Sequence, residues 1–424
     1  MSYELRYLQP TGKTNRIAEV DIIRGFALFG VLLVNVVAFN SLLFAQTDPM
    51  YYLTLPPGQE ALIDQIGSVI IRIFAEAKFY PIFSFLFGLG FYIFMDRAEQ
   101  KYQQRSYKNL GNTENQIFKP RQLFKRRCFF LLLFGIVNLV FIWYGDILHT
   151  YGILGFLLLF FIKKEPKQIK GWIVGLFTIS ILLYVVLGFF TELAIQMKGS
   201  EAIASSELLQ MSKEVYTEGS FLSVVSFRLT QEIPMVLGNL LFWAPKILAM
   251  FLLGILSGKL KIFHDIAGNW NLIVKTAKIT GGISLITTIS TLFFGFQVFP
   301  LPAVVLTPLE ILFGELTSIF LSIFYISAVI ILIRLNKFTK LFEYLKYTGQ
   351  MALTNYLVQC FVCSLVFYGY GLGYLNNMSI TGGILFTILL FIIQMIYSKA
   401  WLTRHSYGPL EKLWRQLTYG NTLS

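Results

Sequence analysis

The stretch that decides the fold is residues 21–40, DIIRGFALFGVLLVNVVAFN, which continues as an apolar run to residue 44. A helix needs about 20 mostly apolar residues to cross a bilayer, and this run supplies them. The run is too long for the apolar part of a signal peptide, and no small-x-small cleavage site follows near its end. We therefore predict that it forms a membrane-spanning helix and is not a removed leader.

The composition extends this prediction to the whole chain. Of 424 residues, 55% are hydrophobic and only 14% are charged, and the mean hydropathy is +0.64. Soluble domains carry about 25% charged residues, so a water-facing surface over most of this chain is excluded. The three cysteines, Cys128, Cys360 and Cys363, lie in apolar runs and form neither a disulfide framework nor a paired metal motif.

Ten apolar runs are candidate membrane spans. They cover residues 21–44, 78–95, 128–145, 149–162, 171–193, 236–257, 277–298, 309–333, 351–370 and 381–402. The fourth run is short, so a tilted or partly interfacial helix is the alternative there. The predicted fold class is an all-α, polytopic integral membrane helical bundle. It forms a single membrane domain over residues 1–424 and leaves no room for a soluble domain of ordinary size.

The basic residues predict the orientation of these spans. With the amino terminus in the cytoplasm, 28 of the 35 Lys and Arg fall in cytoplasmic segments and only three in outer segments. This asymmetry is the positive-inside pattern, and it predicts that both termini are cytoplasmic. The same distribution explains the net charge of +12 by attraction to an anionic inner leaflet, so we expect the lipid bilayer as partner and no nucleic acid.

Several segments lie between or beyond the spans. We predict a basic cytoplasmic loop over 96–127, an outer polar segment over 194–235 with a surface helix near 205–215, and an amphipathic stretch over 61–77. An amphipathic cytoplasmic tail covers 403–424, and its helix should begin at Pro409, a residue favoured in the first turn. No internal repeat is visible, which disfavours inverted-repeat transporter folds.

The first span carries the most informative polar residues. Asp21 and Arg24 are three residues apart and can pair, and Asn35 follows Arg24 by eleven residues, which returns it to nearly the same helix face. Charged groups deep in a bilayer are costly, so they are paired, hydrated or functional. The alternative to a functional stripe is an ion pair that snorkels to the interface plus an amide bonded to another helix.

Two further charged pairs are candidates for a site. Glu76 and Lys78 stand at the start of an aromatic helix, where an interfacial anchor is the alternative. Asp146 and His149, at spacing i, i+3, have the geometry of a carboxylate that orients a general base, and a helix cap is the alternative.

Other polar residues in the spans have simpler interpretations. Asn355 and Gln359, at i, i+4, are more typical of hydrogen bonds between helices than of chemistry. Lys246, Glu310 and Glu315 can pair, but spacing does not say with which partner. Three histidines and three scattered cysteines provide too few ligands for a metal site, and none is predicted.

Five segments in order resemble one family. They are DIIRGFALFGVLLVN (21–35), KFYPIFSFLFGLGF (78–91), GDILHTYGILGF (145–156), GQMALTNYLVQ (349–359) and YGPLEKLWRQLTYG (407–420). They look like the motifs of the YeiB-like membrane proteins, catalogued as domain-of-unknown-function family 418. The resemblance covers nearly the whole chain and implies a multi-pass protein of the bacterial plasma (cytoplasmic) membrane.

That family is grouped with transmembrane acyltransferases of the acyltransferase-three and heparan glucosaminide acetyltransferase types. These use cytoplasmic acyl-CoA to acylate acceptors, commonly sugars, on the far side of a membrane. Acyltransferase-three proteins are similar in having a basic residue and, after ten residues, a histidine on the first helix. Here Arg24 keeps that position, but Asn35 stands in place of the histidine.

The resemblance and the residues together lead to two hypotheses. In the first, acyl-CoA is a co-substrate and no cofactor is bound permanently. Arg24, held by Asp21, binds a phosphate or a carbonyl of the donor, and Asn35 donates to the developing oxyanion or orients the acceptor. His149 with Asp146 is the base, and the donor-side residues are Glu76, Lys78, Arg121, Arg126, Arg127, Asn355 and Gln359. The acceptor is a sugar, a lipid or a small molecule, and a homodimer is a candidate assembly.

In the second hypothesis the polar stripe lines a path for transport or lipid handling, without any bond making. A role as a sensor or a structural partner is the remaining alternative.

Overall fold

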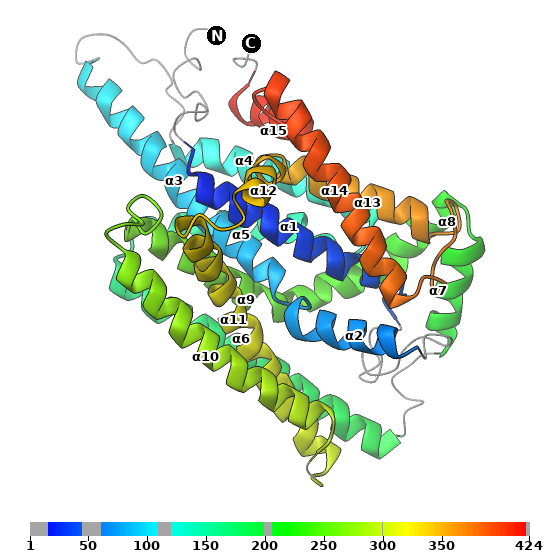
Figure 1. Cartoon of the computed structure of the whole chain (residues 1–424). Helices are drawn as coiled ribbons and strands as arrows, with labels where there is room; N and C mark the ends of the chain where they lie inside the picture. Colours follow the sequence, from blue (N-terminus) through cyan, green and yellow to red (C-terminus); the bar gives the residue numbers. More distant parts are fainter. Residues whose placement is uncertain (1–15, 45–60, 109–119, 199–205, 299, 421–424) are drawn as a thin grey trace.

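The computed structural model describes residues 16–44, 61–108, 120–198, 206–298 and 300–420, and it is entirely helical there (Figure 1). The helices are α1 (Ala18–Phe39), α2 (Leu62–Phe74), α3 (Phe79–Lys108), α4 (Pro120–Val137), α5 (Leu148–Leu157), α6 (Pro166–Lys198), α7 (Ser206–Glu218), α8 (Phe221–Phe227), α9 (Ile233–Lys259), α10 (Trp270–Gly295), α11 (Ala303–Arg334), α12 (Thr339–Gln350), α13 (Ala352–Phe367), α14 (Ile380–Arg404) and α15 (Pro409–Tyr419). Short π-helical turns follow α4 (Asn138–Ile142) and α8 (Arg228–Glu232).

Within the described residues, seven helical segments are long and apolar enough to cross a membrane. They contain α1, α2 with α3, α6, α8 with α9, α10, α11 and α14, and they match seven of the predicted runs. An eighth span exists if α12 and α13 count as one, although the chain bends by 84° between them. The chain is therefore an all-helical membrane protein, and the count of ten spans stays a prediction.

Two predicted runs differ from the structure in an informative way. Residues 149–162 form only the short apolar helix Leu148–Phe160. At about 1.5 Å per residue this helix is roughly 20 Å long, less than the hydrocarbon thickness. Residues 128–145 fall on α4 and its π-helical turn, and the same helix begins with Arg121, Lys125, Arg126 and Arg127.

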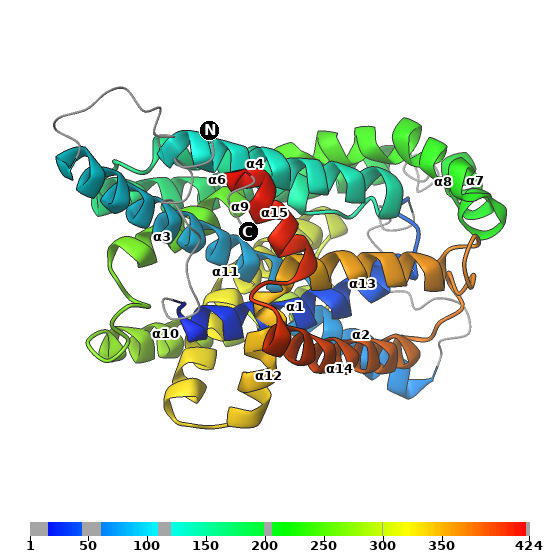
Figure 2. The same ribbon diagram turned by 90° about the horizontal axis from the view of Figure 1, so that it is seen from above.

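The bundle is organised around α1. Figure 1 shows α1 crossing the centre, with α10 and α11 side by side at one edge, and Figure 2 shows α7 with α8 at another edge. Helix α12 approaches α1 closely through glycines. A Cβ on Gly25 would lie 2.1 Å from the Leu345 carbonyl oxygen, and one on Gly349 would lie 1.9 Å from the Asp21 carbonyl oxygen. Small residues at helix contacts are typical of membrane bundles, because they let backbones approach.

A break between α2 and α3 interrupts one of the membrane segments. Residues 75–78 are non-helical, and Ala77 has a positive φ of 59°. Backbone groups freed inside a membrane need partners from the protein. Helix α11 supplies them: the hydroxyls of Ser318 and Ser322 donate to the carbonyls of Ala77 and Lys78 at 2.5 and 2.6 Å. The break is thus held in place by hydrogen bonds from a distant part of the chain.

The predicted helix–helix hydrogen bonds of α13 are confirmed. Asn355 donates to the Thr348 carbonyl at 3.1 Å and to the Ser398 hydroxyl at 3.0 Å, and Gln359 donates to Gln394 at 2.7 Å. Both side chains are buried. They join α13 to α12 and α14 across the 84° bend.

Helices occur in the segments that the sequence places between and beyond the spans, and the position of these segments outside the membrane stays a prediction. The surface helix near 205–215 is α7, the amphipathic stretch 61–77 contains α2, and the tail helix is α15, which begins at Pro409. Parts of three predicted segments lie outside the described residues: 109–119 of the basic loop, 199–205 of the outer polar segment and 421–424 of the tail.

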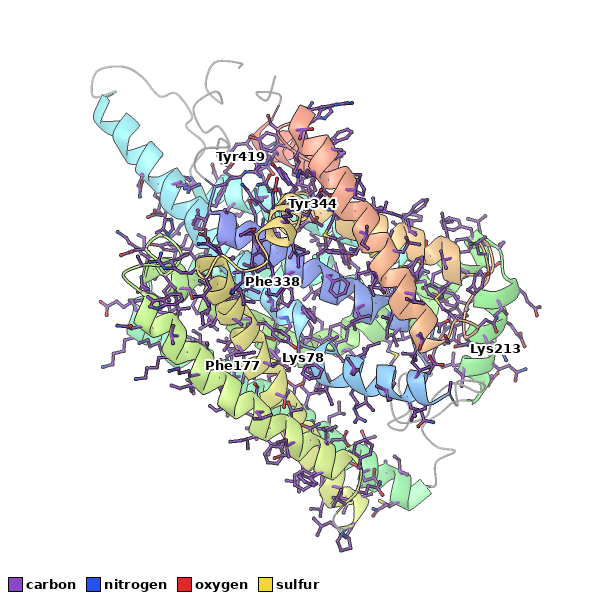
Figure 3. The ribbon with its side chains drawn as sticks, viewed as in Figure 1. Lys78, Phe177, Lys213, Phe338, Tyr344 and Tyr419 are labelled. Atoms are coloured by element: carbon purple, nitrogen blue, oxygen red, sulfur yellow. The ribbon has the colours of Figure 1, made fainter. Side chains whose placement is uncertain are left out.

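A buried cluster ties α7 to the bundle. The Tyr216 hydroxyl donates to Glu232 at 2.7 Å and accepts from the Arg228 guanidinium at 3.2 Å. Arg228 also donates to the Val140 carbonyl at 3.1 Å, and the Arg228–Glu232 ion pair is fully buried. Figure 3 shows Lys213 on the outer side of the same helix, where it is exposed.

Candidate functional site

A cavity of about 830 Å³ lies beside α1 and is the centre of the candidate site. Arg24, Val31, Asn35 and Ala38 of α1 line it, with spacings of seven, four and three residues that place them on one helix face. The predicted stripe from Arg24 to Asn35 is therefore confirmed as a single wall. At about 1.5 Å per residue, the two residues lie about 16 Å apart along the helix axis.

One end of the cavity is strongly basic. It lies where α1 begins and α15 crosses the bundle, and we call it the mouth. Five arginines and two carboxylates line it: Arg16, Arg24, Arg97, Arg127 and Arg415, with Asp21 and Glu411. Five positive and two negative groups leave a surplus of three positive charges. The mouth is thus suited to an anionic group.

The predicted pair Asp21–Arg24 is present at the mouth. The guanidinium donates to the Asp21 carboxylate at 2.7 Å and to the Gly349 carbonyl of α12 at 3.3 Å. The other Asp21 oxygen is buried and has no hydrogen-bond partner. The pair orients Arg24 and leaves part of its guanidinium, 27% exposed, free to face the cavity.

Helix α15 closes over the mouth and lies between α4 and α13 (Figure 2). Its Glu411 accepts hydrogen bonds from the backbone N–H and the hydroxyl of Thr354, at 3.0 and 2.6 Å. Its Trp414 donates to the Arg127 carbonyl at 3.0 Å, and the Arg127 guanidinium stacks 3.8 Å above the Trp414 ring. Tyr419, labelled in Figure 3, ends the helix at the same mouth.

Burial shifts the pKa of two α15 side chains. It raises the pKa of Glu411, although the hydrogen bonds from Thr354 oppose the rise, and it lowers the pKa of the Arg415 guanidinium. Of the three arginines of the basic loop that the sequence assigned to the donor, Arg121, Arg126 and Arg127, only Arg127 lines the cavity beside Arg24. Arg126 donates to the Leu417 carbonyl at 3.0 Å and Arg121 is exposed.

The other end of the cavity, which we call the deep end, is polar and aromatic. Lys246 donates to both carboxylate oxygens of Glu315, at 2.9 and 2.7 Å. Its ammonium lies 5.3 Å above the Tyr80 ring. Glu76, Asn35, Asn239, Trp143, Tyr184 and Trp243 complete this end.

Glu76 and Lys78 both lie in the break between α2 and α3, but their side chains differ in what they contact. Glu76 lines the cavity, whereas Lys78, labelled in Figure 3, turns away and donates to the Arg72 carbonyl at 2.7 Å. Arg72 itself pairs with Glu310. Only Glu76 of the predicted pair therefore belongs to the cavity.

Asp146 and His149 form the predicted pair, but they do not line the cavity. The His149 Nδ1 atom lies 3.0 Å from Asp146, its Nε2 atom lies 3.2 Å from the Thr150 hydroxyl, and its side chain is 3% exposed. Asp146 also accepts from the His149 backbone N–H at 2.8 Å, the bond of a helix cap. The predicted role of His149 as a base is untested, and the geometry matches the cap that is its alternative.

Asn355 and Gln359 also lie outside the cavity wall, since their side chains are engaged between helices. The described residues contain no group of three or more metal-ligating side chains. Arg16, Arg97, Glu411, Arg415 and Asn239 are cavity residues that the sequence did not single out. For the three arginines among them, the available signal was the density of Arg in the predicted cytoplasmic segments. Glu411 lies four residues before Arg415, on the same face of the predicted tail helix.

Comparison with known proteins places the chain in a group without an assigned activity. Residues 257–421 match the family described as protein of unknown function (DUF418). The chain is 31% identical to the uncharacterized protein YxaH of Bacillus subtilis (strain 168), over 97% of this chain and 96% of that protein.

It is also 26% identical to the uncharacterized protein YeiB of Escherichia coli (strain K12), over 95% and 96% of the two chains. No solved structure matches. Similarity at this level along nearly the full length of YxaH, with the DUF418 match, shows that the chain belongs to the YeiB-like family.

Proposed function

We propose that this protein is a membrane-embedded acyltransferase that uses cytoplasmic acyl-CoA to acylate a sugar, a lipid or a small acceptor at or across the membrane. One observation supports the proposal most strongly. A single cavity joins an arginine-lined mouth to a deep end where Asn35 and polar side chains face the same space.

The mouth matches the charged part of the donor. CoA carries a pyrophosphate and a 3′-phosphate, and arginine binds phosphates through paired N–H donors. The positive-inside pattern of the sequence predicts that this mouth is cytoplasmic, where acyl-CoA is available. Arg24 is the arginine best fixed for this task, because Asp21 and the Gly349 carbonyl hold its guanidinium.

The middle of the cavity matches the donor's arm. Between the mouth and Asn35 the walls are apolar and aromatic, with Val31, Phe87, Phe91 and Leu131 among them. The axial rise of about 16 Å from Arg24 to Asn35 is a length that an extended pantetheine arm covers. The thioester would then lie near Asn35, whose amide N–H can donate to the carbonyl oxygen as negative charge develops there.

A second function has a specific observation in its favour. His149 is buried away from the cavity, so no histidine among the described residues faces it. A transporter or lipid-handling protein needs no base, and an anionic amphiphile fits the same basic mouth and apolar middle. The two functions differ in whether bound acyl-CoA is consumed.

The first test is a thermal-shift titration of the detergent-purified protein with acetyl-CoA, CoA and ATP as the nucleotide control. A ligand at 100 times its dissociation constant stabilises the folded state by about 2.7 kcal/mol, which is a measurable shift. We expect a shift with both CoA species and a smaller one with ATP.

The variant for this titration is Asp21→Asn/Arg24→Gln, which removes both charges and leaves neither one buried alone. It should fold and lose the CoA-dependent shift. Equal shifts for CoA and ATP, or a full CoA shift in the double variant, would contradict the proposal and favour transport of another ligand.

A further inference from the structure

Four carboxylates line the cavity, and three of them already have partners. Asp21 pairs with Arg24, Glu315 pairs with Lys246, and Glu411 accepts two hydrogen bonds from Thr354. Glu76 is different: over the part of the chain that the structure describes, its carboxylate has no hydrogen bond and no ion pair. It is therefore the cavity carboxylate whose oxygens are available to a ligand.

The break between α2 and α3 explains why Glu76 faces the cavity alone. Its backbone N–H donates to the Ile71 carbonyl at 2.9 Å, which continues the last turn of α2. The positive φ of Ala77 interrupts the helix at the next residue, and the Lys78 ammonium donates to the Arg72 carbonyl at 2.7 Å. Because Ser318 and Ser322 hold the carbonyls of the break, this arrangement is fixed.

Glu76 shares the cavity with Asn35, the residue that we propose beside the thioester. Phe79, three residues after Glu76, packs directly against α1, where a Cβ on Gly30 would lie 2.2 Å from its ring. Asn35 follows Gly30 by five residues, about 7.5 Å along the helix. Asn35, on α1, and Glu76, in the break before α3, thus border the same cavity.

We infer that Glu76 is the general base that activates the acceptor, an assignment that rests on the acyltransferase function proposed above. The acceptor O–H gives its proton to the Glu76 carboxylate while its oxygen bonds to the thioester carbonyl carbon. The C–S bond then breaks, and the sulfur leaves as the CoA thiolate and takes the proton from Glu76. The products are the acylated acceptor and CoA, and the carboxylate is restored.

His149 is the competing base, and it has only an indirect route to the cavity. Tyr356 lines the cavity, and its hydroxyl lies 3.4 Å from Asp146, which in turn contacts His149. Proton transfer by this route would pass through both Asp146 and Tyr356, whose atoms lie 3.4 Å apart. Glu76 needs no such relay, since its carboxylate borders the cavity itself.

The experiment measures CoA release from acetyl-CoA by the full-length protein in phosphatidylethanolamine–phosphatidylglycerol vesicles, with water, glycerol or glucosamine as the acceptor. The variants are Glu76→Gln, Glu76→Asp and His149→Gln. Glu310→Gln is the matched control, because it removes a nearby negative charge that does not line the cavity. Thermal unfolding of each variant shows that it is folded.

We expect E76Q to lower kcat by about 100-fold or more, as for loss of a general base, with the KM for acetyl-CoA unchanged. E76D, which keeps the carboxylate but shortens its reach, should fall between E76Q and the wild type. E310Q should release CoA at the wild-type rate. A structural role of Glu76 would instead lower the unfolding temperature and leave the kcat of the folded fraction unchanged.

Three results would overturn the assignment. The first is an E76Q variant with a kcat within about tenfold of the wild type. The second, which decides the question if E76Q does not fold, is an E76D variant with the kcat of the wild type. The third is a loss of turnover in H149Q that E76Q does not share. If the wild-type protein releases no CoA with any acceptor, the proposed function itself fails, and the assignment fails with it.

Discussion

Replacing Glu315 by Gln removes the counter-charge of Lys246 at the deep end of the cavity. The Lys246 side chain is 1% exposed and both of its short hydrogen bonds go to Glu315, whereas the Glu315 side chain is 14% exposed. Breaking a buried ion pair from one side costs about 3–5 kcal/mol, because it leaves an uncompensated buried charge. We expect E315Q to cost an amount in this range.

The reverse substitution should cost less. Lys246→Met leaves Glu315, which borders the cavity and can be hydrated there, so the expected loss is about 1–3 kcal/mol, as for one unsatisfied polar group. Replacing both residues by Met removes both charges and should recover most of the stability of the wild type. The predicted order of stability is thus wild type or double variant first, then K246M, then E315Q.

Equilibrium unfolding in mixed detergent micelles, followed by the fluorescence of the six tryptophans, measures this order. A K246M variant less stable than E315Q would show that the carboxylate, not the ammonium, is the more deeply buried charge. A double variant whose loss equals the sum of the single losses would show that the two groups do not stabilise each other. Either result would refute the reasoning.

The remaining predictions concern packing, a buried cluster and pH. Gly349→Ala should destabilise the protein by about 1–3 kcal/mol because its Cβ overlaps the α1 backbone. The control Gly282→Ala, with nothing within 4 Å of the new Cβ, should be neutral or stabilising, and equal losses in thermal unfolding would contradict this. Arg228→Met leaves Glu232 fully buried without its counter-charge and should cost about 3–5 kcal/mol, whereas a loss below about 1 kcal/mol would show that water reaches the cluster. Since burial raises the pKa of Glu411, protonation stabilises the folded state. This contribution is full below pH 4.5 and is lost as the pH rises through the folded-state pKa, so stability measured against pH should be flatter in Glu411→Gln.

The features that the sequence predicted correctly are those decided within one helix. Hydropathy marks a span over about 20 residues, and the pairing of Asp21 with Arg24 follows from a separation of one turn. The shared face of Arg24 and Asn35 follows from helix periodicity alone. Proline and the amphipathic pattern likewise marked α15 at the correct residue.

The features that the sequence missed depend on partners far along the chain. Lys246 and Glu315 are 69 residues apart, and Arg72 and Glu310 are 238 apart, so no local pattern pairs them. The break after α2 exists because Ser318 and Ser322 satisfy its carbonyls from more than 240 residues away. For the same reason the sequence could not show that Glu76 would be separated from Lys78.

The position of His149 away from the cavity also could not be predicted from local sequence patterns. Its i, i+3 spacing to Asp146 fits a catalytic pair and a helix cap equally well. The burial of His149 comes from α4, where Gly135 lets the backbone of His149 approach closely, and spacing along the chain does not show this contact. Titratable pairs in membrane spans therefore need a cavity beside them before they indicate chemistry.

The most direct test of the central claim is a cryo-electron microscopy map of the protein in lipid nanodiscs with saturating acetyl-CoA. The account predicts density for the CoA phosphates against Arg24 and Arg127 at the mouth. It also predicts continuous density along the cavity to a thioester beside Asn35 and Glu76. A cavity filled by lipid acyl chains, with no density for CoA at the arginines, would contradict the claim.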